Sequence, residues 1–353
     1  MEETIEFLSI KDPHFRFGFN PPSNRTNNFF EEIDNKIDQL ISYGKKHNIT
    51  NLIITGDIND EYNSLKWKFT KNYLENKKRI EKLSQQFKIY SNAGNHDFLD
   101  GKETITNSPF EEYYKQNLIK YFNNKKIIIQ NKTKDKQIYF YGLDYSKEKS
   151  KTIEQLKKIE TELKNKKPLF SIVLLHIGVV PYNKEKDIEN IFTDLNYQKL
   201  NELIPSVSLI INGHYHKGFQ TQKLNNQTFI NNWAFTRLSM DKYSISKEHV
   251  PEFEHITFNL TTKQLTTKTI QLNVVPFEKA FIQKTEIESE LNKHKIDVSF
   301  DNIKKINDTD KKNEKQIFNE IKNEIEEKLF KEIQHTNKEK IIKDAFLELE
   351  KRL

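Results

Sequence analysis

Short runs of Val, Ile, Leu, Phe and Tyr recur along the first 270 residues, and turn-forming or polar residues bound most of them. Runs of this length are typical of buried strands. They predict strands at 5–10, 52–55, 87–90, 126–130, 137–143, 170–175, 207–211, 229–232, 254–260 and 265–272. Apolar residues at helical spacing predict helices at 29–44, 64–86, 149–166 and 197–203.

The order of these elements predicts the fold class. Strands and helices alternate over the first 90 residues, which implies a largely parallel sheet with right-handed crossovers. A second series of strands and helices follows between 126 and 272. The two halves together predict an α/β protein, a four-layer α/β/β/α sandwich spanning residues 1–273.

The composition changes near residues 274–277, and beyond them Lys, Glu, Asn and Asp dominate. Two one-sided apolar stripes, at 317–333 and 341–349, predict a helical hairpin. We therefore expect a small C-terminal α/β or helical extension at 274–353. Its apolar stripes either pack on each other or form a docking face for a partner helix.

Polar segments end or follow five of the predicted strands. They are Asp12-Pro13-His14, Gly56-Asp57, Gly94-Asn95-His96-Asp97, His176 and Gly213-His214-Tyr215-His216. In α/β sheets the carboxyl ends of the strands are where ligands bind. Carboxylate, amide and imidazole groups gathered there suit two divalent metals, and Asp57 is the natural bridging carboxylate. Each segment alone is common turn chemistry, so their shared strand context favours the metal site.

Composition and charge narrow the function classes. The net charge of +6 is compatible with a polyanionic partner, although lysines that only maintain solubility would give the same value. The absence of cysteine excludes disulfides, zinc–thiolate sites and thiol nucleophiles. Neither a secretory signal nor an apolar stretch of about 20 residues is visible, so we expect a cytoplasmic protein without a membrane partner.

The ordered set resembles the calcineurin-like metallophosphoesterase superfamily, whose pattern runs D-x-H, G-D, G-N-H-D/E, H and G-H-x-H. The resemblance covers residues 5 to about 240. It implies one metal held by Asp12, His14, Asp57 and His216 and another held by Asp57, Asn95, His176 and His214. It also implies that His96 meets the phosphate or protonates the leaving oxygen, with Asp97 orienting the His96 ring.

Three features resemble the SbcD-type DNA repair nucleases within this superfamily. Protein phosphatases usually carry an arginine soon after the second motif, and none follows Asp57 here. Residues 235–239, downstream of the histidine pair, look like the small-x-x-Arg-x-Ser segment of the nucleases. The layout beyond residue 274 is similar to their DNA-capping domain and to the helices that bind the coiled-coil ATPase SbcC.

This resemblance implies a DNA exonuclease or endonuclease that acts in DNA repair or recombination and uses two metal ions. It also implies an SbcC-like ATPase partner, and it allows a homodimer. Manganese is the expected metal, with iron, zinc and magnesium as alternatives. Basic and aromatic residues near the site are candidates for contacting DNA. They are Arg16, Arg25, Tyr215, Lys217 and Arg237.

Two other functions stay open. The chain can be a phosphoesterase acting on a small molecule or a phosphoprotein, with the C-terminal helices serving in oligomerisation. It can also be a non-catalytic binding scaffold, although the intact ligand set disfavours that reading. The aromatic residues of the loop at 15–28 either stack on bases or pack against the core.

Overall fold

The computed structural model describes residues 3–16, 21–22, 25–26, 28–60, 70–99, 102–131, 133–181, 195–238 and 248–281. The chain divides into two compact units, Met1–Pro21 with Asn27–Val275 and Pro22–Thr26 with Pro276–Leu353. The described part of the second unit includes the short helix α6 (Phe277–Ala280). The helical hairpin predicted at 317–349 lies outside the described residues.

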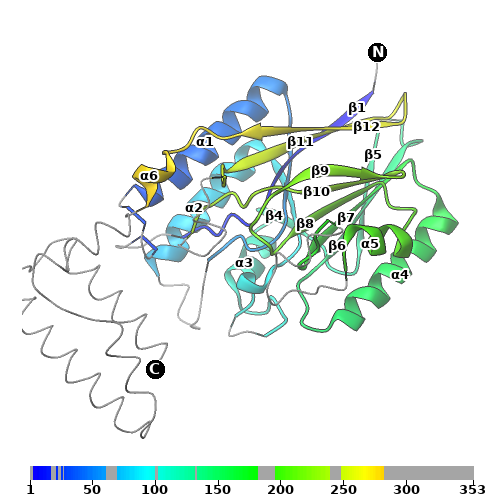
Figure 1. The fold of residues 1–353 in the computed structure, drawn as a ribbon, viewed down its shortest axis with the longest axis horizontal. Helices are drawn as coiled ribbons and strands as arrows, with labels where there is room; N and C mark the ends of the chain where they lie inside the picture. Colours follow the sequence, from blue (N-terminus) through cyan, green and yellow to red (C-terminus); the bar gives the residue numbers. More distant parts are fainter. Residues whose placement is uncertain are drawn as a thin grey trace, which may run out of the picture. The chain divides into compact units, whose positions relative to one another are not determined.

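Two sheets form the centre of the first unit (Figure 1). Their strands are β1 (Thr4–Ile10), β2 (Asn51–Ile54), β3 (Lys88–Ser91), β4 (Ile119–Tyr121), β5 (Lys126–Gln130), β6 (Gln137–Leu143), β7 (Phe170–His176), β8 (Leu209–Gly213), β9 (Phe219–Leu224), β10 (Gln227–Asn231), β11 (Glu252–Asn259) and β12 (Gln264–Gln271). The first sheet has the order β12-β11-β1-β2-β3-β4 and the second β5-β6-β7-β8-β10-β9.

The parallel arrangement predicted for the first 90 residues is confirmed, since β1, β2 and β3 run parallel, although each whole sheet is mixed. Strands β1 to β4 run parallel, whereas β11 and β12 add an antiparallel edge to the first sheet. In the second sheet β6, β7, β8 and β10 are parallel, and β5 and β9 are antiparallel edges. The parallel centres direct the carboxyl ends of their strands to one edge of each sheet.

Helices cover the outer face of each sheet. They are α1 (Phe29–His47), α2 (Lys71–Gln86), α3 (Pro109–Lys115), α4 (Lys149–Lys166) and α5 (Tyr197–Leu203). α1 buries one apolar stripe and ends at Asn48, which has the left-handed φ of 56° common at helix C-termini. α2 begins after Thr70, whose side chain accepts a hydrogen bond from the Tyr73 amide. The earlier helix start predicted at residue 64 lies outside the described residues.

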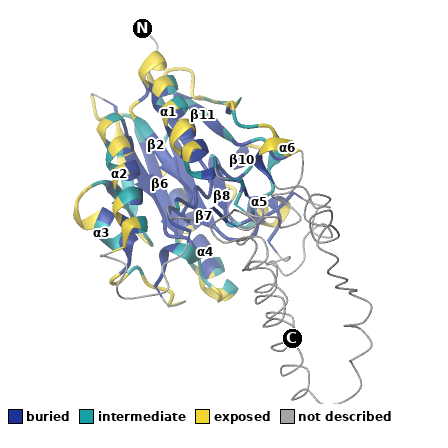
Figure 2. Cartoon of the chain, turned by 90° about the vertical axis from the view of Figure 1, so that its left-hand side faces the viewer, coloured by how far each residue is buried: buried dark blue, intermediate teal, exposed yellow. Residues whose placement is uncertain are grey.

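The alternation of side chains along the strands builds three apolar layers between the sheets and helices. Phe7 and Ile172 point into a cluster between the two sheets. Their neighbours Leu8 and Val173 point the other way, Leu8 toward the cluster that contains α1–α3 and Val173 toward that of α4 and α5. Figure 2 shows the buried strands flanked by helices with exposed outer faces. The predicted four-layer α/β/β/α sandwich is therefore confirmed.

The sequence analysis did not predict α3, β4 or β9. α3 and β4 are short, with seven and three residues. β9 is an edge strand on which exposed positions alternate with partly buried ones, so it lacks the apolar run of a central strand. Within the described ranges, no helix combines the length and apolar character needed to cross a bilayer.

Candidate metal centre

The five polar segments meet at the carboxyl ends of the central strands. The first sheet contributes Asp12 and His14 after β1, Asp57 after β2, and the 3-10 turn η2 (Asn95–Asp97) after β3. The second sheet contributes His176 at the end of β7, with His214 and His216 after β8. Neither sheet carries the whole set, so the centre exists only where the two sheets pack together.

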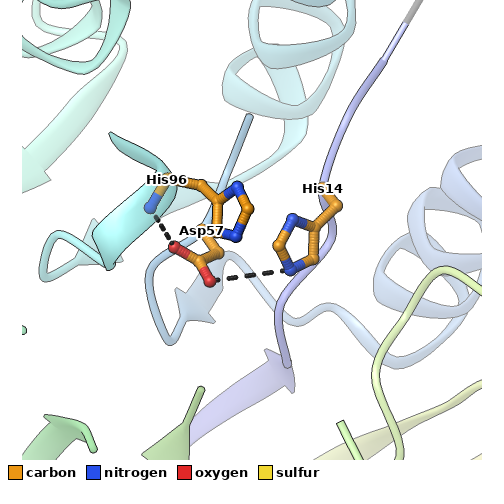
Figure 3. Close-up of side chains that lie close together, drawn as sticks. All are labelled: His14, Asp57 and His96. Carbon is orange, nitrogen blue, oxygen red and sulfur yellow. Dashed lines mark hydrogen bonds and ion pairs between the residues drawn. The ribbon is translucent and has the colours of Figure 1, made fainter. Parts of the chain in front are cut away.

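Two clusters of metal-ligating side chains share Asp57. One contains His14, Asp57 and His96, and the other contains Asp57, His176 and His214; within each, the candidate ligand atoms lie within 4.8 Å of one another. Asp57 Oδ2 is 3.6 Å from His14 Nε2 and 3.1 Å from His176 Nε2. Figure 3 shows the first cluster around the Asp57 carboxylate. The carboxylate predicted as a bridge lies between both groups.

His216 and Asn95 extend the two clusters. His14 Nε2 lies 2.9 Å from His216 Nε2, and His214 Nδ1 lies 2.9 Å from Asn95 Oδ1. Each of these two distances fits a hydrogen bond between the atoms. Each also fits two ligand atoms whose lone pairs point at the same cation. Both residues predicted as ligands therefore lie in direct contact with a member of a cluster that could hold a metal.

The tautomer of His176 is set by the backbone. Its Nδ1 lies 2.6 Å from the Thr55 carbonyl oxygen, so Nδ1–H donates and Nε2 faces Asp57. A carbonyl acceptor behind the ring is the usual way in which proteins orient a metal-binding histidine. Burial alone would lower the pKa of His176, but the carboxylates of Asp57 and Asp12 raise it to about 9.

The centre gathers buried carboxylates and buried imidazoles. Asp12 and Asp57 are almost fully buried, and Asp12 Oδ1 has no hydrogen-bond partner within the described part of the chain. Burial lowers the pKa of His14 far below its usual value, and burial with the charge of His176 lowers that of His214 to about 3. Neutral imidazoles beside buried carboxylates match the needs of divalent cations, so the residues fit two such ions.

The backbone at the ligands is strained. Asp12, His14, Asp57 and His214 have φ values of 42°, 43°, 46° and 83°, all in the left-handed region. Non-glycine residues in this region cost about 1–3 kcal/mol each and cluster at functional sites. Local conformational preference therefore opposes this geometry, and the surrounding packing maintains it.

Asp97 does not orient the His96 ring as the resemblance implied. Its carboxylate accepts hydrogen bonds from the backbone amides of Ile58, Asn59 and Gly94, at 3.0, 3.4 and 3.0 Å. The ring Nδ1 of His96 instead contacts the carbonyl oxygen of Asp60. Asp97 thus ties the loop after β2 to the loop after β3, and Asp60 orients His96.

Three of the suggested DNA contacts are buried. Arg237 is 2% exposed and donates from Nη2 to both carboxylate oxygens of Glu32, each at 3.1 Å. Arg25 is also buried, with its guanidinium 4.7 Å from the centre of the Phe281 ring. Tyr215 is buried and stacks on Phe219. These placements do not fit contacts with DNA, because the side chains are occupied inside the protein.

Two of the suggested contacts remain at the surface. The Arg16 side chain is 40% exposed and its Nη1 lies 3.0 Å from Asp60 Oδ2. Lys217 is partly exposed, with Nζ 6.0 Å from the centre of the Phe219 ring. In the loop at 15–28, Phe15 is buried against Phe235, which matches the packing alternative for that residue. Phe17 and Phe19 lie outside the described residues.

Three residues around the centre were not predicted from the sequence. Asp60 contacts His96 and lies beside His14, with Oδ1 3.7 Å from His14 Nδ1. Lys11 is buried and donates from Nζ to Asn231 and to the carbonyl oxygen of Asn232. Tyr145 packs against His214. Tyr145 follows the predicted strand at 137–143, so the strand-end rule used for the other segments would have found it.

Among comparisons with known proteins, the match to a family model agrees with this geometry. The family model for calcineurin-like phosphoesterases matches residues 12–218. No curated protein matches the chain. Among solved structures, calcineurin-like phosphoesterase YfkN from Bacillus subtilis is 13% identical with a TM-score of 0.45, covering 84% of this chain and 98% of its own. A hypothetical protein from Thermus thermophilus is 8% identical with a TM-score of 0.42, covering 76% and 100%.

The family match spans every ligand segment from Asp12 to His216, and it covers more than half of the chain. Two His and Asp clusters that share one carboxylate are what hydrolysis of a phosphoester with two divalent metals requires. On these grounds the chain is a member of the calcineurin-like phosphoesterase family and a metal-dependent phosphoesterase.

Proposed function

We propose that this phosphoesterase cleaves phosphodiester bonds in DNA, as a nuclease of the SbcD type that works with a coiled-coil ATPase. The observation that supports phosphodiester hydrolysis is the pair of clusters on Asp57. The choice of DNA comes from the sequence: no arginine lies directly after Gly56-Asp57, and the layout beyond residue 274 is similar to that of the nucleases.

Two bound divalent metals would neutralise the phosphoryl oxygens and activate water for attack on phosphorus. We assign the first ion to Asp12, His14, Asp57 and His216 and the second to Asp57, Asn95, His176 and His214. Manganese suits this mixture of oxygen and nitrogen ligands, and iron, zinc or magnesium can use the same groups.

His96 is the residue placed to handle a proton. Its Nδ1 meets the carbonyl oxygen of Asp60, which fixes Nδ1–H as the donor on that side. The other ring nitrogen, Nε2, is then the atom that donates to the leaving oxygen or to the phosphate. The His96 backbone amide donates to Asp57 Oδ1 at 2.9 Å, which ties the backbone of His96 to the bridging carboxylate.

The substrate is tested with purified protein and Mn²⁺ on three substrates: end-labelled duplex DNA, single-stranded DNA and bis-p-nitrophenyl phosphate. We expect cleavage of all three by the wild type and its loss in His96→Ala. His255→Ala is the matched control, because His255 contacts Glu6 and Tyr43, away from the centre. Hydrolysis of only the small ester would refute DNA as substrate and favour a small-molecule phosphoesterase.

A protein that binds metal but cleaves none of the three esters would support the scaffold alternative.

The partner proposal has its own test, because an SbcC-like ATPase co-expressed with the full chain should co-purify with it. A chain that elutes alone in the presence of that ATPase would contradict the partnership. The elution volume of the isolated chain also decides between a monomer and a homodimer.

A further inference from the structure

Tyr145 lies against the second ligand cluster. It follows β6, a central strand of the second sheet, and so emerges at the same edge as His176 and His214. The ring centre of Tyr145 is 5.1 Å from that of His214, with the planes at 42°, and 6.3 Å from that of His176, at 76°. The phenol therefore lines the side of the centre formed by these two histidines.

Hydrogen bonds fix the backbone at Tyr145. The Tyr145 amide donates to the Ala93 carbonyl at 2.9 Å, and the Ala93 amide donates to Asp144 Oδ1 at 2.8 Å. Asp144 Oδ2 in turn accepts from the Tyr121 hydroxyl at 2.6 Å. Ala93 directly precedes the loop that carries Asn95 and His96, so these bonds tie the backbone at Tyr145 to that loop of the first sheet.

The residues after Tyr145 are also held. Ser146 Oγ donates to one carboxylate oxygen of Glu103 and the Lys147 amide donates to the other, each at 2.9 Å. The backbone that carries Tyr145 is therefore held on both sides of the residue. Such preorganisation is expected of a group that binds a ligand, because ordering it on binding would weaken affinity.

The hydroxyl of Tyr145 is the part that packing does not explain. The residue is only partly buried, and its hydroxyl has no hydrogen-bond partner within the described ranges. If packing against His214 were its whole role, a phenylalanine would serve equally well.

We propose that Tyr145 binds the substrate by donating a hydrogen bond from its hydroxyl to a non-bridging phosphoryl oxygen, while its ring forms the wall of the site beside His214. A phenol is a neutral donor near neutral pH and adds no charge to a centre that already holds cations. The inference rests on phosphoester hydrolysis at this centre, and it holds whether or not DNA is the substrate.

The test compares Tyr145→Phe with the wild type and with Tyr114→Phe. Tyr114 is a matched control, since it is an exposed tyrosine on α3 whose ring contacts Tyr121. Each Mn²⁺-loaded protein is measured for metal content, for affinity toward inorganic phosphate by calorimetry, and for kcat and KM on bis-p-nitrophenyl phosphate. Tyr145→Leu is added to remove the ring as well.

We expect Tyr145→Phe to keep its metal content and to bind phosphate about tenfold more weakly, as for a lost hydrogen bond to a charged group. Its kcat/KM should fall by a similar factor, with Tyr114→Phe unchanged. Wild-type phosphate affinity and kcat/KM in Tyr145→Phe would overturn the inference. DNA run in parallel separates the proposals: if the wild type leaves DNA uncut while Tyr145→Phe still loses phosphate affinity, only the substrate proposal fails.

Discussion

Replacing Gly94 with alanine should displace the carboxylate that both ligand clusters share. A Cβ at Gly94 would lie 2.6 Å from Asp57 Cγ and 2.6 Å from its backbone nitrogen, and closer still to Oδ1. Gly94 itself has an extended backbone, with φ of −90° and ψ of 180°, which alanine adopts freely. The substitution therefore acts through the clash alone, without backbone strain at residue 94.

The size of the effect follows from these distances. Ordinary contact begins at 3.4 Å, so Asp57 Cγ must move by about 0.8 Å, and the oxygen must move further. A misplacement of about 1 Å at a reacting centre costs roughly 100-fold in rate. We therefore expect kcat/KM on bis-p-nitrophenyl phosphate to fall about 100-fold, or about 2.7 kcal/mol of transition-state stabilisation.

Gly44→Ala is the control with a comparable clash away from the site. Gly44 lies near the end of α1, and a Cβ there would be 2.5 Å and 2.6 Å from two ring atoms of Phe87. Both variants should lose about 1–3 kcal/mol of unfolding free energy from overpacking, measured by urea titration. Only Gly94→Ala should lose activity and bound Mn²⁺. Wild-type kcat/KM and metal content in a folded Gly94→Ala would refute the reasoning.

Three further predictions concern stability. Arg237→Met should lower the free energy of unfolding, measured with urea, by about 3 kcal/mol. This is the lower end of the range for breaking a buried ion pair, because Lys36 still lies 3.6 Å from Glu32. Weakened DNA binding at unchanged stability would contradict this prediction. Burial lowers the pKa of His249 to about 3. The unfolded chain therefore takes up a proton at His249 below about pH 6.5, while the folded chain does not. As the pH falls from 6 to 4, the free energy of unfolding should drop by about 1.4 kcal/mol per pH unit from this group. His249→Gln should flatten that slope, and equal slopes in urea titrations of both proteins would count against it. Mn²⁺ at 100 times its Kd should stabilise the fold by about 2.7 kcal/mol and raise Tm by about 5–10 °C in calorimetry, reversibly with chelator; a Tm insensitive to Mn²⁺ would refute the metal assignment.

Much of the fold could be read from local pattern. The helices at 149–166 and 197–203 have the predicted bounds, because their apolar spacing and flanking residues carry all of the needed information. The strand ends, and with them the candidate ligands, were found for the same reason. β9 escaped prediction because an exposed edge strand needs no continuous apolar run.

Contacts between distant residues explain what the sequence could not show. Arg237 looks like a surface cation in its local context, and only Glu32, 205 positions away, makes it part of the interior. Lys11 bonds to Asn232 across 221 positions. The contact of Asp60 with His96 depends on its backbone carbonyl, which every residue type possesses, so no side-chain motif can reveal that contact.

The division of the ligands between the two sheets has a consequence for how the protein matures. His14 and His216, whose imidazoles lie 2.9 Å apart, are separated by 202 positions in the chain. During synthesis, the amino-terminal sheet can acquire its central strands well before β8 leaves the ribosome. The metal centre is then among the last features to form. Ions bound there would cross-link the two sheets, so the sheets could separate only after the ions had dissociated.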